Sequence, residues 1–280
     1  MSETSHPADA GAPVLWHEPA GAAAAEGPGR DRPPVLLLHG FGSTAELNWG
    51  RTGWLRALHL AGARTIAPDL PGHGRSPRPH AADRYTPARL VEEVLRLLDA
   101  LGEPRVDVLG YSMGARLAWE LAAGHPDRVR RAVLAGFGPA DVLGGPGSGP
   151  ARQAGPTAPA DDPFEGPFAE VFRTAAALPH NDPAALAACA RGQAAHPFTA
   201  DPVPEGVPLL FAAGERDSLA AGVETLAARV PGARVVRAPG RDHRTAVTSR
   251  ELRSAVLEFL APPGDVTHGD RTRAARPAGR

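Results

Sequence analysis

The sequence predicts an α/β protein in which helices cover both faces of a mostly parallel sheet, and three observations lead to this prediction. Short apolar segments alternate with segments of helical periodicity along the chain, as expected of parallel strands joined by crossover helices. The 280 residues suffice for one domain that carries an inserted subdomain. At 106–123, a buried strand, a tight turn and a helix follow one another without an intervening residue.

The expected elements follow this alternation in order. Strands are expected at 35–39, 64–68, 106–111, 131–137, 208–214 and 234–238. Helices are expected at 47–61, 87–101, 112–124, 219–230 and 249–260. The helix at 87–101 has the clearest start, because Pro87 follows the capping residue Thr86 and leucines and valines then recur at helical spacing.

The segment at 138–206 interrupts the alternation and is too long for an ordinary connection. We therefore expect a small helical cap there, inserted over the carboxyl ends of the strands, where open α/β sheets bind ligands. The core then consists of 33–137 and 207–262. A disordered insertion is the alternative. The N-terminal extension at 1–32 and the tail at 263–280 are expected to be mostly disordered, because they are rich in Ala, Gly and Pro or in polar residues.

Composition argues against several classes of partner. The formal net charge of −1 gives no global attraction to nucleic acid or to an anionic membrane. A single cysteine, Cys189, excludes an internal disulfide and a zinc cluster built on thiolates. No leader or membrane-length apolar segment is evident. The sequence is therefore expected to be cytoplasmic, with a small-molecule substrate and no nucleic-acid or membrane partner, while its oligomeric state is not indicated.

The turn in the strand–turn–helix segment carries the clearest chemical signal. Residues 110–114 read GYSMG and fit the pattern G-x-S-x-G, in which a sharp strand-to-helix turn exposes a serine hydroxyl, here that of Ser112. Glycines on either side allow the neighbouring strand and helix to approach a residue with a strained backbone. A serine hydroxyl is a poor nucleophile near neutral pH, so it needs a base within reach and a group that orients the base.

Four further motifs follow predicted strands or turns. They are HGFG at 39–42, DLPGHGRS at 69–76, GERD at 214–217 and GRDH at 240–243. The GYSMG turn at 110–114 is called the nucleophile elbow below. Together with this elbow and the order of the elements, the four motifs resemble the α/β-hydrolase superfamily over about 34–260. That family's first two strands are faint here and are expected to be short or absent.

The resemblance implies a Ser-His-Asp triad in the family's chain order. Ser112 would be the nucleophile, His243 the base that takes its proton, and Asp217 the acid that orients the histidine. Asp141 is the competing candidate for the acid. Asp242 is too close to His243 in sequence to align with its far ring nitrogen and is expected to be a turn residue.

The family pattern also assigns an oxyanion hole and a pocket. The backbone N–H groups of Phe41 and Met113 would stabilise the developing negative charge. Gly40, Tyr111 and Arg116 are the expected substrate-binding residues. No metal and no organic cofactor is expected, because the triad itself supplies nucleophile, base and electrophilic assistance.

Arg116 leaves two interpretations open. It lies four residues after Ser112 on the same helix face, so it either forms an ion pair with a nearby carboxylate or binds a substrate carboxylate. The run at 110–116 resembles the menaquinone-pathway synthase MenH, a lyase of the α/β-hydrolase fold, although Gly114-Ala115 departs from the Gly-Gly that is usual there. The favoured function is a serine hydrolase acting on a small ester or thioester. The alternatives are a MenH-like lyase or carbon–carbon bond hydrolase on an anionic substrate, and a non-catalytic binding module.

Overall fold

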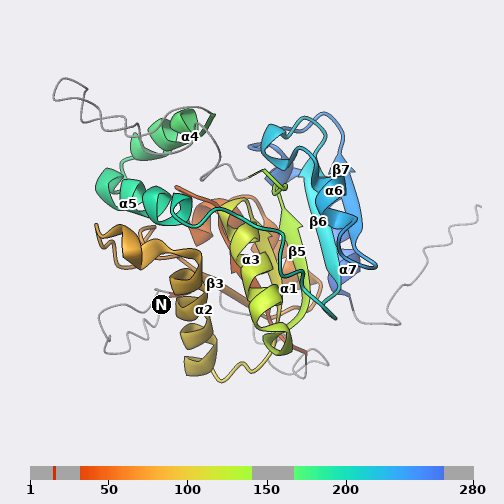
Figure 1. The fold of residues 1–280 in the computed structure, drawn as a ribbon. Coiled ribbons are helices and arrows are strands. Elements are labelled where there is room, and N and C mark those ends of the chain that lie inside the picture. Colours follow the sequence, from red (N-terminus) through yellow and green to blue (C-terminus); the bar gives the residue numbers. More distant parts are fainter. Residues whose placement is uncertain (1–14, 17–31, 141–166, 262–280) are drawn as a thin grey trace, which may run out of the picture.

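The strands of this chain form a single twisted layer. The computed structural model describes residues 15–16, 32–140 and 167–261, and within them the sheet has the order β1-β3-β2-β4-β5-β6-β7 (Figure 1). Strands β2 to β7 are parallel, and only the short β1 is antiparallel to its neighbour β3. The predicted fold class is confirmed. The strands are β1 (Leu15–Trp16), β2 (Val35–Leu38), β3 (Thr65–Pro68), β4 (Val106–Tyr111), β5 (Val129–Ala135), β6 (Leu209–Gly214) and β7 (Arg234–Ala238).

Helices cover both faces of this sheet. On one face, α2 (Pro87–Ala100), α3 (Met113–Gly124) and α6 (Val223–Ala227) pack on a buried cluster that includes Leu36 and Leu38. On the other face, α1 (Trp54–Leu60) and α7 (Arg250–Leu260) pack on a cluster that includes Val35 and Leu37. Successive residues of β2 therefore point to opposite faces and are all buried, as a central parallel strand requires.

The order of strands defines where a ligand would bind. From β2 the chain passes to β3 on one side and then crosses to β4 on the other side of β2. The loops that leave β2 and β4 thus diverge toward opposite faces, and a crevice opens outside the carboxyl ends of these adjacent strands. The HGFG motif follows β2 and the elbow follows β4, so both lie at this crevice.

Two predicted helices are shorter than the sequence suggested. The helix expected at 47–61 consists of a π-helical turn, η2 (Glu46–Gly50), and of α1, separated by Gly53 with a φ of 81°. The helix expected at 219–230 consists of a 3₁₀ turn, η5 (Ser218–Ala220), and of α6, separated by Gly222 with a φ of 74°. A glycine in the left-handed region interrupts each helix, which periodicity alone does not reveal. Further 3₁₀ turns are η3 (Ala82–Tyr85), η4 (Pro126–Arg128) and η6 (Ala246–Thr248).

Two helices lie between β5 and β6 in sequence and beyond the end of the strands in space (Figure 1). They are α4 (Pro167–Ala176) and α5 (Pro183–Ala194), and the Asp182 side chain caps α5 by accepting from the Ala184 N–H at 2.9 Å. Phe168 and Phe172 of α4 pack against Leu186 of α5. The other side of α5 reaches the main core through Cys189, which is fully buried.

Parts of the predicted domain organisation lie outside the described residues. This applies to nearly all of the extension at 1–32, to 141–166 of the expected cap and to the whole tail at 263–280. The proposed limits of the core, cap and terminal segments therefore stay predictions. Among the described helices, none combines the length and the apolar character needed to cross a membrane.

Candidate active site

Ser112 occupies a strained turn between β4 and α3. Its φ of 54° and ψ of −116° make it the only non-glycine residue with a positive φ in the part of the chain that the structure describes. Such a backbone persists only where the surroundings determine it. Here the Ser112 N–H donates to the Ala135 carbonyl on β5 at 2.8 Å, so the sheet itself fixes the turn.

The glycines on either side of the elbow are required by close approach of backbone. A Cβ added to Gly110 would lie 2.2 Å from the Gly114 carbonyl oxygen, and one added to Gly114 would lie 2.0 Å from the Leu38 carbonyl oxygen. Both distances are far below van der Waals contact. The predicted role of the glycines is confirmed, because only residues without a side chain let α3 start directly against β2 and β4.

The structure brings Ser112, His243 and Asp217 together, although 131 residues separate the serine from the histidine. The His243 Nε2 lies 3.1 Å from the Ser112 Oγ. The His243 Nδ1 lies 3.1 Å from each carboxylate oxygen of Asp217. Since Nδ1 faces a carboxylate and donates to it, Nε2 is left as the acceptor for the serine proton.

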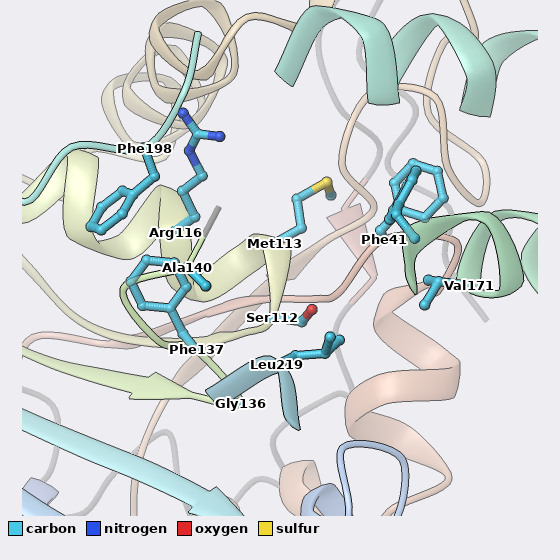
Figure 2. A pocket seen from close by; sticks show the side chains of 11 residues that line it. Phe41, Ser112, Met113, Arg116, Gly136, Phe137, Ala140, Val171, Phe198 and Leu219 are labelled. Carbon is cyan, nitrogen blue, oxygen red and sulfur yellow. The ribbon is translucent and has the colours of Figure 1, made fainter. Parts of the chain in front are cut away.

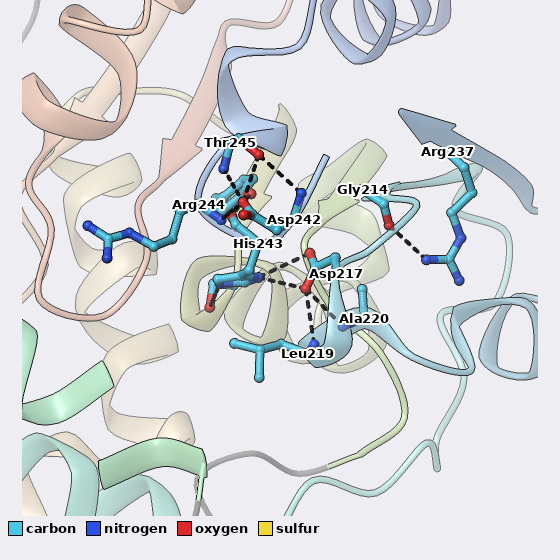
Figure 3. A network of polar contacts seen from close by, with 11 residues as sticks. Gly214, Asp217, Leu219, Ala220, Arg237, Asp242, His243, Arg244 and Thr245 are labelled. Atoms are coloured by element: carbon cyan, nitrogen blue, oxygen red, sulfur yellow. Dashed lines mark hydrogen bonds and ion pairs between the residues drawn. The ribbon is translucent and has the colours of Figure 1, made fainter. Parts of the chain in front are cut away.

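Asp217 and His243 lie in the turns that follow β6 and β7, respectively. Asp217 accepts from the N–H groups of Leu219 at 3.0 Å and Ala220 at 3.3 Å (Figure 3). Its side chain is fully buried, whereas that of His243 is 22% exposed. The aspartate is therefore rigid, and the histidine faces both it and the serine.

Asp242 has the turn role that the sequence indicated. Its carboxylate accepts from the N–H of Arg244 at 3.1 Å and from the N–H and hydroxyl of Thr245 at 2.9 and 2.6 Å (Figure 3). Hydrogen bonds from the Thr245 hydroxyl and from these N–H groups lower the pKa of Asp242. The competing candidate Asp141 lies outside the described residues.

Tyr111 takes a position behind the histidine. Its hydroxyl donates to the His243 carbonyl at 2.5 Å, and the two rings lie 5.5 Å apart. The side chain is buried, and burial raises the pKa of the phenol. Tyr111 is not among the residues that line the pocket beside Ser112, and its hydroxyl contacts the histidine loop. Its role in substrate binding stays a prediction.

The HGFG loop lies beside the elbow. The Gly40 N–H donates to the Asn48 side chain at 3.1 Å, and a Cβ added to Gly40 would lie 3.4 Å from the Ser112 Cβ. Gly40 thus contributes backbone close to the nucleophile. Met113 is the first residue of α3, and the first N–H groups of a helix have no partner within it.

Two buried histidines support this loop: His39, its first residue, and His73 from the turn after β3. The His39 Nε2 accepts from the Leu70 N–H at 2.9 Å, so its Nδ1 carries the proton that is donated to the Gly40 carbonyl at 2.8 Å. The His73 ring packs edge-on against the rings of His39 and Phe41, 5.1 and 5.8 Å away. Burial lowers the pKa of both imidazoles, to about 3 for His73. Both therefore support the loop as neutral residues.

A pocket opens above Ser112 (Figure 2). Apart from the serine and Arg116, its lining is apolar or backbone. Figure 2 shows Phe137 and Phe198 on one side of the serine and Phe41 with Val171 of α4 on the other. The apolar side chains that line it come from the core and from the α4–α5 segment: Phe41, Met113, Phe137, Phe168, Val171, Phe198 and Leu219.

Arg116 is one of the residues that line this pocket, but its guanidinium group is bound by other protein groups. Its guanidinium lies 3.7 Å from the Glu120 carboxylate, one turn further along α3, and donates to the His196 carbonyl. Figure 2 shows the guanidinium pointing away from Ser112. Burial raises the pKa of Glu120, and the Arg116 charge opposes this rise. The geometry matches the ion-pair interpretation of Arg116.

Asn181 is a polar residue at this site that the sequence did not suggest. It lies in the turn between α4 and α5 and donates to the Gly42 carbonyl at 2.9 Å. The two residues are 139 positions apart in sequence, so no local pattern could have linked them. Within the described residues, no group of three or more His, Cys, Asp or Glu side chains could hold a metal ion.

Comparison with known proteins agrees with this fold. A family model described as alpha/beta hydrolase fold matches residues 33–144. A 2-hydroxymuconate semialdehyde hydrolase from Pseudomonas putida is 45% identical over 103 residues, which are 37% of this chain and 36% of that protein. Epoxide hydrolase B from Mycobacterium tuberculosis is 37% identical over 126 residues, 43% of this chain and 34% of that protein. The chain thus spans about a third of the length of the curated relatives it matches.

Solved structures match over most of their length. The enol-lactonase from Burkholderia xenovorans superposes with a TM-score of 0.65 and 25% identity, covering 89% of this chain and 95% of that one. A hydrolase from Pseudomonas aeruginosa superposes with a TM-score of 0.62 and 28% identity, covering 84% of this chain and 92% of that one. These matches cover 84% and 89% of this chain, compared with 37% and 43% for the two curated relatives.

Proposed function

We propose that this chain, a member of the α/β-hydrolase superfamily, is a serine hydrolase that cleaves a small carboxylic ester or thioester through an acyl-enzyme. The observation that carries the proposal is the continuous line of 3.1 Å contacts from the Ser112 Oγ through His243 to Asp217. It begins at the floor of an apolar pocket and ends on a buried carboxylate. This is the arrangement that converts a serine hydroxyl into a nucleophile.

Each residue of the line has one task in acyl transfer. The Ser112 Oγ attacks the carbonyl carbon while the His243 Nε2 takes its proton, and the imidazolium then protonates the leaving alcohol or thiol. Water, activated by the same histidine, hydrolyses the acyl-serine and restores the enzyme. Asp217 keeps Nδ1 protonated and stabilises the imidazolium, and Tyr111 supports the histidine from behind through its carbonyl.

The oxygen of the attacked carbonyl becomes negatively charged in both steps. The N–H groups of Met113 and Phe41 are the proposed donors, because one starts the helix after the nucleophile and the other belongs to the loop after the adjacent strand. Loss of one such donor typically costs ~10²–10³ in rate. No side chain of the pocket is needed for this work.

The lining of the pocket indicates the acyl group that it accepts. Phenylalanine rings surround the serine, and the Arg116 charge is engaged by Glu120 and by the His196 carbonyl. A neutral, apolar acyl chain can be desolvated in such a pocket at little cost, whereas a carboxylate would need a compensating cation. We therefore favour neutral esters of short to medium length.

A second candidate function is a lyase or carbon–carbon bond hydrolase on an anionic substrate. It is supported by the resemblance at 110–116 and by a relative whose name specifies a hydroxymuconate semialdehyde. The competing observation is again Arg116, whose guanidinium points away from Ser112 (Figure 2). This candidate requires the ion pair with Glu120 to open when substrate binds.

Labelling with a fluorophosphonate probe, followed by mass spectrometry, tests the proposed function. We expect phosphonylation of Ser112, and hydrolysis of p-nitrophenyl esters that rises and then falls with acyl chain length as the pocket fills. Matched p-nitrophenyl esters with and without a terminal carboxylate separate the two candidates. Absence of both labelling and ester hydrolysis would remove the serine-hydrolase proposal.

A further inference from the structure

The loop after β2, residues 39–44, is in contact with the cap helix α4 and with the turn between α4 and α5. We call it the oxyanion loop. The Phe41 ring packs edge-on against Phe168 of α4, 5.1 Å away. The Gly42 carbonyl accepts a hydrogen bond from Asn181 at 2.9 Å. A Cβ added to Gly42 would lie only 2.4 Å from the Ala175 Cβ. The cap and this loop therefore pack as closely as neighbouring elements of a core.

Asn181 is immobilised by its own contacts. It is 9% exposed, and its amide nitrogen donates both to the Gly42 carbonyl and, at 3.0 Å, to the Ala175 carbonyl in the last turn of α4. Its backbone N–H donates to the Leu178 carbonyl at 3.0 Å. An amide nitrogen has two hydrogens, so both are used, and they join the end of a cap helix to the oxyanion loop.

The hydrogen bond from Asn181 to the Gly42 carbonyl lies one residue after Phe41, whose N–H is the proposed oxyanion donor. The peptide that contains this N–H is held within the loop, because the Gly40 carbonyl accepts from the Ser43 N–H at 3.2 Å and from His39 at 2.8 Å. The peptide that follows Gly42 is held on both sides, because its N–H, that of Ser43, donates to the Gly40 carbonyl and its carbonyl accepts from Asn181 of the cap. Gly42 itself, with a φ of 69°, is the conformationally permissive residue between them. Asn181 thus adds a restraint from the cap on rotation at Gly42, beside the Ser43 bond within the loop.

We propose that Asn181 is a positioning residue of the oxyanion hole, which keeps the oxyanion loop in the conformation that points the Phe41 N–H at the reacting carbonyl oxygen. The docked cap, through this one side chain, thus completes the catalytic site. The inference rests on the proposed serine-hydrolase function. It assigns to the α4–α5 turn a task in the chemical step, in addition to covering the pocket.

The expected kinetic signature follows from when the oxyanion forms. Because its charge develops in the transition state, a misplaced donor lowers kcat and leaves KM nearly unchanged. Complete loss of a donor costs ~10²–10³, so displacement of the loop should cost about 10- to 100-fold. A residue that only stabilises the cap would change substrate affinity or stability instead.

Asn181→Ala and Asn181→Asp are the test variants, since the first removes the amide and the second keeps its shape but replaces the donor with a carboxylate. His80→Ala is the matched control, because it removes another contact between core and cap, the 2.9 Å pair of His80 with Asp182, outside the oxyanion loop. The measurements are kcat and KM for a p-nitrophenyl ester, the rate of fluorophosphonate labelling, and the Ki of a trifluoromethyl ketone, whose tetrahedral adduct carries an oxyanion.

We expect both Asn181 variants to lose about 10- to 100-fold in kcat and in labelling rate, to raise the Ki of the ketone by the same factor and to keep KM within about twofold. His80→Ala should match the wild type. Equal kcat in Asn181→Ala and wild type, a loss confined to KM, or an equal loss in His80→Ala would overturn the inference while wild-type labelling still supports the serine hydrolase. A wild type that is not labelled at Ser112 would overturn both. If Asn181→Asp does not fold, Asn181→Ala decides alone.

Discussion

The two sides of the pocket floor are positioned by different kinds of interaction. Ser112, Asp217 and His243 each lie in a turn after a strand. The backbone N–H groups of Ser112 and Asp217 donate to the Ala135 and Gly214 carbonyls, and the His243 carbonyl accepts from the Tyr111 hydroxyl on β4. The oxyanion loop, in contrast, is bound by side chains: its own His39, Asn48 of η2 and, from a distant segment, the cap residue Asn181. We call these the strand-end side and the loop side.

This difference indicates how each side responds to change. The strand-end side is built by the sheet, so a substitution there removes a chemical group and leaves the geometry in place. The loop side depends on packing and on neutral buried groups, so it should respond to cap mutations and to pH. The predictions below test this contrast, from the largest expected effect to the smallest.

Removal of the nucleophile should have the largest effect. Ser112→Ala deletes one oxygen from a turn whose backbone is fixed by the Ala135 carbonyl, so kcat for esters should fall by roughly 10⁶-fold with the fold intact. Steady-state kinetics and a thermal melt on the same preparation measure both. More than a few per cent of wild-type activity at an unchanged Tm would exclude Ser112 as the nucleophile.

Replacement of Asp217 should cost less activity than removal of the nucleophile but far more than replacement of Asp242, the sequence neighbour of His243. Asp217→Asn allows the His243 Nδ1 to become the acceptor, so the wrong tautomer faces the serine and kcat should fall ~10⁴-fold. Asp242→Asn is the matched control, because Asp242 bonds only its own turn among the described residues. The same ester assay compares the kcat values of the two variants. The opposite ranking would assign the acid role to Asp242.

Arg116→Met changes a residue that lines the pocket between the two sides. Its removal leaves the His196 carbonyl and the Glu120 carboxylate without this partner, and Glu120 is already 36% exposed. The free energy of unfolding should therefore fall by about 1–3 kcal/mol, below the cost of breaking a fully buried pair. Activity on a neutral ester and on its ω-carboxylate analogue should decline together. Selective loss on the anion at an unchanged Tm would favour the lyase-like candidate.

The loop side should lose stability in mild acid. The pKa of His73 is about 3 in the folded chain, below its ordinary value of 6.5, so between these values the unfolded chain binds a proton that the folded chain does not. Stability thus falls as pH drops below about 6.5, by about 2 kcal/mol at pH 5, since each pKa unit is about 1.4 kcal/mol. The lowered pKa of His39 acts in the same direction.

His73→Asn separates the contribution of His73 from that of His39. Asparagine offers an N–H for the Pro71 carbonyl, which His73 contacts at 2.9 Å, but it does not titrate. Denaturant unfolding of both proteins at pH 5 and pH 8 should show a difference between the two pH values that is about 2 kcal/mol smaller in the variant. Identical pH dependence in the two proteins would show that His73 does not titrate in this range.

The sequence by itself determined the fold class, the order of the main elements and the strand-end residues brought together by the structure. It could do so because each depends on a short local pattern: buried runs mark the strands, and GYSMG, GERD and GRDH lie where the strands end. Parallel strands place their carboxyl ends at one edge, so residues far apart in sequence converge there.

Only the tertiary structure decided the positions of Tyr111, Arg116 and Asn181. A side chain that follows a strand can point to either face, and Tyr111 turned out to contact the histidine loop. Arg116 is paired by a glutamate on its own helix and a carbonyl 80 residues away. Asn181 meets Gly42 through packing of the cap. Such contacts arise from the relative placement of whole elements, which depends on many weak interactions summed over the chain and leaves no periodic trace in the sequence.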